Sequence, residues 1–177
     1  MKVLNFGSCN IDHVYKMKHI VRPNETVSAL ELNFFPGGKG LNQSIALSKA
    51  GAKVFHAGCV GKDDDMLRQL LIENGVDDRY LRTVDEKTGH AVIQVDENGN
   101  NSIFVYKGAN FCITKEQVDS TLSNFGEGDI LLLQNEINNL EYIINSADEK
   151  GMKIFLNPSP FNETVQKIDF NKLYFLI

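Results

Sequence analysis

The chain has 177 residues, 42% of them hydrophobic, and a formal net charge of −5 at pH 7. This length and hydrophobic content predict one domain with a substantial core and leave little room for two. The acidic balance and the lack of a long Lys/Arg run argue against a nucleic-acid or anionic-membrane partner, which would require a basic patch.

The N-terminus and the cysteines both predict a cytoplasmic protein. Residues 3–6 are mostly apolar, but this run is far too short for a signal peptide or a membrane span. The cysteines are odd in number, widely spaced and without a CxxC pair, which is typical of free thiols in a reducing cytosol. They are Cys9, Cys59 and Cys112.

The chain begins with a predicted buried strand over residues 2–7, followed by a turn over residues 7–13. Strand exits are where open α/β sheets bind ligands. In this turn Asp12 could accept hydrogen bonds from two neighbouring hydroxyls, and Asn10 could both donate and accept. The alternative is an Asx-type turn that only caps the loop. A half-exposed strand is expected next, over residues 25–35, because apolar and polar residues alternate there.

Residues 36–43, Pro-Gly-Gly-Lys-Gly-Leu-Asn-Gln, stand at the start of a helix predicted over residues 39–50. A glycine backbone and Lys39 at a helix N-terminus favour an anion or a cluster of hydroxyl oxygens. The motif is not a P-loop, which needs Ser or Thr where Gly40 stands. Nor is it a dinucleotide fingerprint, whose third small residue is replaced by Gln43. The alternative is a glycine turn with a solvated lysine.

A second apolar strand, predicted over residues 53–57, leads to three consecutive aspartates at residues 63–65. An apolar stripe follows them, and carboxylates in a first turn are stabilised by the helix dipole. We therefore expect a helix to start there. A metal site is the alternative.

The rest of the chain alternates between strand and helix signals. Residues 89–106 form a predicted hairpin with its turn at Asn98-Gly99, and Thr114 to Gln117 resembles a capping box that opens a helix. An apolar strand at residues 130–133 ends in polar residues at 134–136, and after a helix a strand at 152–156 ends in Asn157-Pro158. This alternation predicts an α/β fold with a doubly wound, mostly parallel sheet flanked by helices, and with a small β flap.

The last residues, 173–177, are predicted to form another buried strand. A parallel strand is normally followed by a polar loop at its exit, whereas this sequence stops there. We therefore expect a chain that is truncated at its C-terminus.

Taken in order, these motifs resemble the ribokinase branch of the PfkB-type carbohydrate kinases. The resemblance begins at residues 7–12 and 37–43, and Gln43 favours this branch over the phosphofructokinase-like one. It implies that residues 1–177 are the N-terminal part of one ribokinase-like α/β domain, with a flap or lid formed by residues 26–34 and 89–107. Further matching segments cover essentially the whole chain: residues 58–63, Thr88-Gly89, Gly108-Ala109-Asn110, the strand ending in Glu136, and residues 157–160.

The resemblance also implies a sugar site and cofactors. The family's catalytic base, adenine pocket and magnesium residues lie beyond Ile177, so no catalytic, cofactor or metal residue is expected within this chain. The resemblance implies ATP and Mg²⁺ for the complete enzyme, with a monovalent cation as a further candidate, and a homodimer through the flap. The sugar-binding residues that it implies are Asn10, Asp12, Gly38, Lys39, Asn42 and Glu136.

The function implied by the resemblance is phosphoryl transfer from ATP to the 5-hydroxyl of D-ribose. Residues 1–177 alone are expected to be inactive, because they hold the sugar-binding half without the ATP-binding and catalytic half. The alternatives are an inactive sugar-binding remnant and another sugar kinase of the same family. A nucleotide-dependent oxidoreductase rests only on the partial match to the dinucleotide fingerprint.

Overall fold

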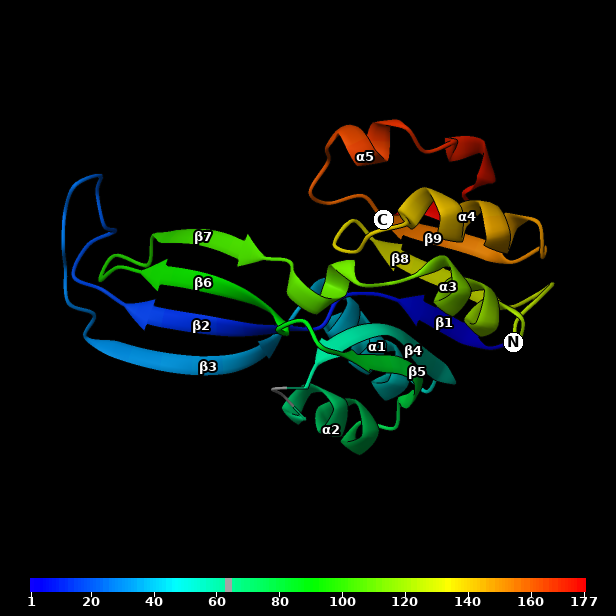
Figure 1. Ribbon diagram of the computed structural model, residues 1–177, viewed down its shortest axis with the longest axis horizontal. Coiled ribbons are helices and arrows are strands. Elements are labelled where there is room, and N and C mark those ends of the chain that lie inside the picture. Colours follow the sequence, from blue (N-terminus) through cyan, green and yellow to red (C-terminus); the bar gives the residue numbers. More distant parts are fainter. Residues whose placement is uncertain (63–64) are drawn as a thin grey trace.

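A six-stranded sheet forms the centre of the computed structural model, which describes residues 1–62 and 65–177 (Figure 1). The strand order is β10-β9-β8-β1-β4-β5, and all five neighbouring pairs are parallel. The predicted parallel α/β sheet is therefore confirmed. Its strands are β1 (Val3–Phe6), β4 (Val54–Gly61), β5 (Asp77–Val84), β8 (Ile130–Gln134), β9 (Lys153–Asn157) and β10 (Phe175–Leu176).

Helices cover both faces of this sheet. Successive side chains of a strand point to opposite faces, and here both faces carry apolar side chains that helices bury. Leu4 and Phe6 pack with α3 and α4, whereas Val3 packs in a second core with α1 and α2. A fully buried side chain of this size stabilises the fold by roughly 1.5–3 kcal/mol. The helices are α1 (Lys39–Lys49), α2 (Met66–Glu73), α3 (Lys115–Leu122), α4 (Leu140–Asp148) and α5 (Glu163–Gln166), with 3-10 turns η1 (Gly108–Phe111) and η2 (Phe170–Lys172).

The helix signals are largely confirmed. Thr114 caps α3 by accepting a hydrogen bond from the backbone N–H of Gln117. The Gln117 side chain does not complete a capping box, because it donates instead to the carbonyl of Gly58 at 2.8 Å. Among the described residues, no helix is long and apolar enough to cross a membrane.

A second, four-stranded sheet projects from the carboxyl edge of the central sheet, and we call it the flap (Figure 1). The predicted hairpin is confirmed as its β6-β7 pair. β2 lies between β3, which is antiparallel to it, and β6, which is parallel. The flap strands are β2 (Asn10–Lys16), β3 (Glu31–Gly37), β6 (Gly89–Val95) and β7 (Asn101–Tyr106).

The first half of the flap differs from the prediction made from the sequence. Residues 10–13 are not a turn but the start of β2, which is held in place by β6, about 80 residues later in the chain. The strand expected over residues 25–35 begins at Glu31, because its pairing with β2 starts there, and it continues to Gly37. β2 therefore joins the flap, and residues 26–30 lie outside its strands.

Two further differences concern the central sheet, and a third point concerns the start of α2. β5 was not predicted, because its alternating charged residues obscure its apolar side. The last strand is short, and it is exposed rather than buried, with Phe175 57% exposed. Of the acidic run, Asp63 and Asp64 lie outside the described residues, and α2 begins at Met66.

A buried polar cluster lies where β1, α1 and β4 meet. His56 is completely buried, with Nδ1 2.8 Å from Ser44 Oγ and Nε2 3.2 Å from Cys9 Sγ. Ser44 Oγ accepts a hydrogen bond from Asn5 Nδ2, so its own proton is free to donate to His56 Nδ1. Burial lowers the pKa of His56 to about 4, opposed by a weaker effect of a hydrogen bond with Gly7. His56 is therefore neutral at pH 7.

We expect His56 to make the fold sensitive to mild acid. Its pKa is near 6.5 in the unfolded chain and about 4 in the folded one, so the unfolded state binds the extra proton in between. The contribution of His56 to the free energy of unfolding should be almost fully present above pH 6.5. It should fall by about 2 kcal/mol as the pH is lowered from 7 to 5. Urea unfolding at both pH values measures the loss. His56→Gln should flatten this pH dependence, and an unchanged slope in this variant would contradict the assignment.

Candidate functional site

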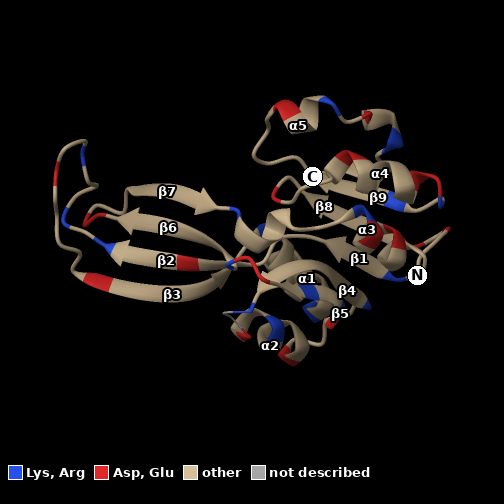
Figure 2. Cartoon of the chain, in the orientation of Figure 1, with Lys and Arg blue, Asp and Glu red and all other residues tan. Residues whose placement is uncertain are grey.

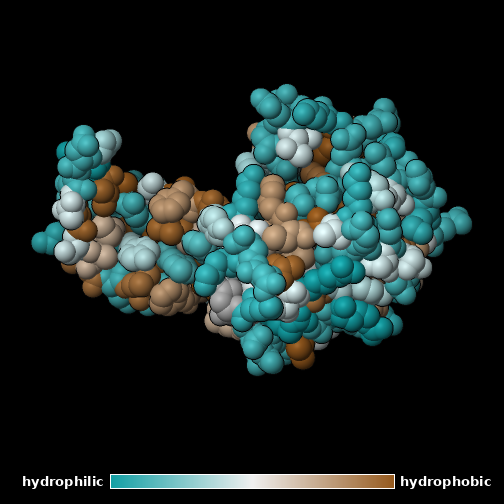
Figure 3. Space-filling model, in the orientation of Figure 1, coloured by the Kyte–Doolittle hydropathy of each residue, from teal (hydrophilic) through white to brown (hydrophobic). Residues whose placement is uncertain are grey.

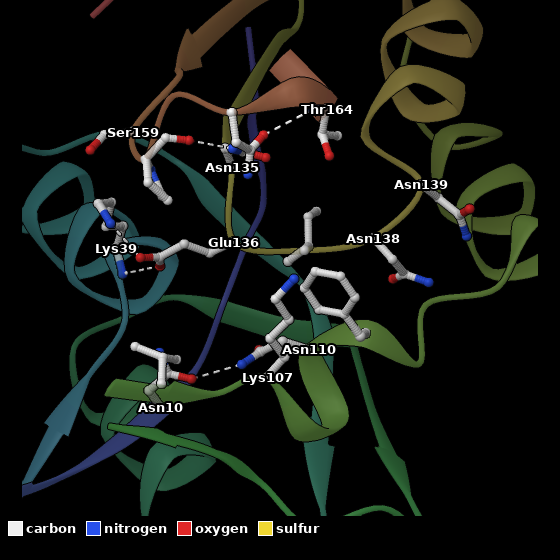
Figure 4. A pocket seen from close by; sticks show the side chains of 15 residues that line it. Asn10, Lys39, Lys107, Asn110, Asn135, Glu136, Asn138, Asn139, Ser159 and Thr164 are labelled. Atoms are coloured by element: carbon white, nitrogen blue, oxygen red, sulfur yellow. Dashed lines mark hydrogen bonds and ion pairs between the residues drawn. The ribbon is translucent and has the colours of Figure 1, made fainter. Parts of the chain in front are cut away.

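A cavity of about 510 Å³ opens at the carboxyl end of the central strands (Figure 4). It is lined by Asn10 from the start of β2, Lys39 from the start of α1 and Glu136 from the exit of β8. Ser159 and Asn162, from the segment after β9, also line it. Side chains far apart in sequence are thus brought to one edge of the sheet, where parallel α/β folds bind ligands.

Glu136 is the centre of the polar contacts in this cavity. Its carboxylate forms an ion pair with the Lys39 ammonium group. It also accepts a hydrogen bond from Ser8 Oγ at 2.6 Å and one from the backbone N–H of Lys39 at 3.0 Å. Lys39 is therefore not a solvated lysine beside a glycine turn, and the carboxylate is held in one orientation by three donors.

The glycines bring the start of α1 against the end of β1. A Cβ on Gly40 would lie 2.3 Å from the backbone nitrogen of Ser8 and 2.6 Å from the carbonyl carbon of Gly7, which no side chain tolerates. Gly38 precedes the helix with φ of 94°, a conformation that glycine adopts without strain. Close backbone approach therefore explains the glycine motif, and it leaves the first N–H groups of α1 facing Ser8 and Glu136.

Asp12 lies on β2, on the flap rather than on the cavity wall. Its carboxylate lies against Gly37, where a Cβ would come within 2.3 Å of Oδ2. Burial raises the pKa of Asp12, Glu136 raises it further, and His13 opposes the change. On the flap Asp12 shares a face with Val105, which lines the cavity, so this face of the flap is turned toward the site.

The structure assembles the predicted sugar-binding residues only in part. Asn10, Lys39 and Glu136 line the cavity, and Gly38 lies directly before Lys39. Asp12 does not line it, and neither does Asn42, which is exposed in the first turn of α1. These two residues adjoin the site without completing its wall.

Two residues of the site were missed by sequence reasoning. Ser8 donates to Glu136, and Asn110 donates to Asn10 Oδ1 at 2.7 Å. Both stand next to residues that the motifs singled out, but neither lies in a regular pattern that predicts a partner about 100 residues away. Their roles depend on contacts between distant segments.

The site has no recognisable metal centre. Among residues 1–62 and 65–177 no three His, Cys, Asp or Glu side chains are grouped so that they could hold a metal ion. Glu136 is already held by Lys39 and Ser8. The metal alternative for the aspartate run lies partly on residues 63–64, outside the described chain.

Comparisons with family models and with curated proteins agree on one family. The pfkB family of carbohydrate kinases matches residues 1–173. A ribokinase from Haemophilus influenzae is 34% identical over 159 residues, which cover 87% of this chain and 52% of that protein. The chain spans about half the length of the curated relatives that it matches.

Solved structures agree with this result. The ribokinase from Cryptococcus neoformans in complex with ADP has a TM-score of 0.85 at 34% identity, covering 99% of this chain and 57% of that one. The Arabidopsis thaliana ribokinase complexed with ribose and ATP has a TM-score of 0.72 at 28% identity, covering 88% and 53%. The chain therefore has the ribokinase-like α/β fold.

We expect Gly40 to be indispensable for the site. Gly40→Ala places a methyl group into the backbone of Ser8, so it should lower the free energy of unfolding by roughly 3 kcal/mol or more. Gly126→Ala is the matched control, because the nearest atom to its added Cβ is the carbonyl oxygen of Lys150 at 4.0 Å. Urea unfolding of both variants measures the difference. Similar stability of the two variants would show that the backbones at Gly7 and Gly40 are not in close contact.

Proposed function

Since this chain belongs to the pfkB family of carbohydrate kinases, we propose that residues 1–177 form the sugar-binding part of an ATP-dependent ribokinase. The observation that carries this proposal is the convergence of Asn10, Lys39 and Glu136 on one cavity at the strand exits. D-ribose is the proposed sugar, because ribokinases recur among the relatives at about 34% identity and one solved relative is complexed with ribose.

The chemistry of the site suits a neutral polyhydroxyl ligand. Lys39 and Glu136 neutralise each other, so this pair offers donors and acceptors rather than a net charge. Lys107 also lines the cavity, with its ammonium group 4.0 Å from the centre of the Phe111 ring. A sugar hydroxyl can donate to a carboxylate and accept from an ammonium or amide group at the same time. We propose that Asn10, Lys39 and Glu136 contact the hydroxyls directly, with Gly38 supplying backbone. Asp12 would join when the flap approaches the sugar, and Asn42, in the first turn of α1, is a further proposed contact.

The proposed complete reaction is phosphoryl transfer from ATP, with Mg²⁺ as its metal, to the 5-hydroxyl of ribose. The ADP and ATP in two ribokinase structures support the nucleotide. Phosphoryl transfer needs groups that stabilise charge on the γ-phosphate and orient the nucleophile. We propose that residues 1–177 bind ribose without phosphorylating it.

We expect the 177-residue protein to bind D-ribose in isothermal titration calorimetry and to release no ADP in a coupled assay with ribose, ATP and Mg²⁺. Asp12→Ala should weaken ribose binding by roughly 2–4 kcal/mol, the value of two hydrogen bonds to a charged acceptor. Lys39→Met should also weaken binding.

A suitable control for the Asp12 variant is Asp85→Ala, because the Asp85 side chain is 89% exposed and forms an ion pair with surface Lys62. This variant should bind ribose as the wild type does. No detectable binding of any pentose by the wild type would contradict the proposed function. Unchanged affinity in Asp12→Ala would remove Asp12 alone from the site.

We further propose that the flap forms a homodimer interface. β6 and β7 contain no charged residue, and apolar surface covers much of the flap (Figures 2 and 3). The face opposite Asp12 carries a row of rings that spans all four strands, with Phe104 60% exposed next to it. A single layer with both faces in water buries too little apolar surface to be stable by itself. The rings of the row belong to Phe34, His13, His90 and Tyr106.

We expect light scattering to detect a dimer that the flap variant Phe104→Asp converts to monomer. A carboxylate in the middle of an apolar interface is desolvated without a partner, which costs several kcal/mol. Phe170→Asp, at an exposed position in η2 on the main body, should leave the dimer intact. A monomeric wild type at high concentration, or a dimer that persists in Phe104→Asp, would contradict the flap interface.

A further inference from the structure

Asn110 is almost completely buried in η1, and a backbone group determines the orientation of its side-chain amide. Asn110 Oδ1 lies 2.9 Å from the backbone nitrogen of Cys9. A backbone N–H can only donate, so the atom that faces it must be the amide oxygen. Asn110 Nδ2 therefore points the other way, where it donates to the carbonyl oxygen of Cys9 at 3.2 Å.

The same nitrogen determines the orientation of Asn10. Asn110 Nδ2 uses its second proton on Asn10 Oδ1 at 2.7 Å, so the Asn10 oxygen faces Asn110 and accepts from it (Figure 4). Asn10 lines the cavity, and no described residue accepts a hydrogen bond from its Nδ2. The N–H donors of Asn10 are thus left for a ligand, whereas its oxygen already accepts from Asn110.

Gly89 leaves the space in which these two amides meet. It is paired with Asn10 across the β2-β6 seam. A Cβ on Gly89 would lie 2.1 Å from Asn110 Nδ2 and 2.4 Å from Asn10 Oδ1. Any side chain at this position would separate the two amides, so the Thr88-Gly89 and Gly108-Ala109-Asn110 segments act on the same contact.

We propose that Asn110 is a positioning residue that holds Asn10 as an obligate hydrogen-bond donor toward the cavity. The ligand atom that faces Asn10 must then be an acceptor, such as a hydroxyl oxygen used through its lone pair. The orientation of the amides is independent of what binds, while the identity of the ligand as a pentose rests on the proposed function. Glu136, by contrast, can only accept while it is ionised, so Asn10 and Glu136 require opposite hydrogen-bond roles from the ligand.

The first experiment needs no ligand. Solvent exchange of the assigned side-chain amide protons is measured by NMR in the wild-type protein. The Asn110 protons should exchange at least tenfold more slowly than those of Asn10, because only the former are both hydrogen-bonded. Slower exchange of the Asn10 protons, or equal exchange, would overturn the proposed orientation whether or not the protein binds a sugar.

The second experiment measures how the orientation of the Asn10 amide affects ligand binding. Binding of D-ribose analogues in which one hydroxyl is replaced by hydrogen or by fluorine is measured by calorimetry. Fluorine accepts weakly and cannot donate, so at the position that faces Asn10 the fluoro analogue should bind at least about fivefold more tightly than the deoxy analogue. In Asn110→Asp the Asn10 amide should turn its N–H groups to the new carboxylate, and this preference should disappear or reverse.

Two further variants separate positioning from folding. Asn162→Asp adds the same charge to the same cavity and keeps the cap of α5, since Asp accepts the same backbone hydrogen bonds, so the fluorine preference should remain. Gly89→Ala should abolish the preference without removing any polar group, which provides the test if Asn110→Asp does not fold. Ribose binding with the same analogue ranking in the wild type, Asn110→Asp and Gly89→Ala would overturn the positioning role. Absence of any pentose binding would count against the proposed function, and the exchange experiment would then decide the orientation alone.

Discussion

The contact between the backbones of Gly7 and Gly40 is the constraint on which the site depends. It places the first turn of α1 directly against the exit of β1, closer than any side chain would allow. This contact lets the Ser8 hydroxyl accept from the Gly40 N–H and donate to Glu136. The carboxylate therefore reaches the helix N-terminus together with the lysine that neutralises it. A helix displaced by one methyl group would leave Glu136 with fewer donors in a half-buried cavity, where an unpaired charge is costly.

The layer beneath this contact is polar, which is unusual for the middle of a parallel sheet. Its amides pair with one another, except that Gln134 Oε1 is buried with no hydrogen-bond partner among the described residues. Asn5 Nδ2 donates to the carbonyl of Gly40 and to Ser44, and Asn5 Oδ1 accepts from Gln134. Gln134 Nε2 also donates a hydrogen bond to Gln43 Oε1 at 2.6 Å. Because hydrogen bonds are directional and buried amides are expensive to leave unpaired, this network fixes the position of α1 more sharply than apolar packing would. The second amide of the glycine motif, Gln43, is thus part of the support of the site.

Local patterns predicted the parts of the fold that are stabilised locally. The apolar run of β8, the stripe of α4 and the turn at Asn98-Gly99 need no distant partner to be recognised, and all three are present. β2 escaped prediction because its strand character comes from β6, which lies far along the chain. The site followed the same rule: the motifs indicated Lys39 and Glu136, whereas Ser8 and Asn110 act through contacts that span more than 100 residues.

The parallel seam between β2 and β6 has a consequence for how the protein folds. On either side of it, β2-β3 and β6-β7 are antiparallel pairs whose strands are close in sequence, and such hairpins form within microseconds. The seam itself joins residues about 80 positions apart, and α1, β4, α2 and β5 lie between its two hairpins in the chain. Closing so long a loop carries an entropic cost that only the assembled core offsets. The seam should therefore form late, and until it forms each hairpin exposes an unpaired strand edge, which is the form of this protein that is most prone to aggregation.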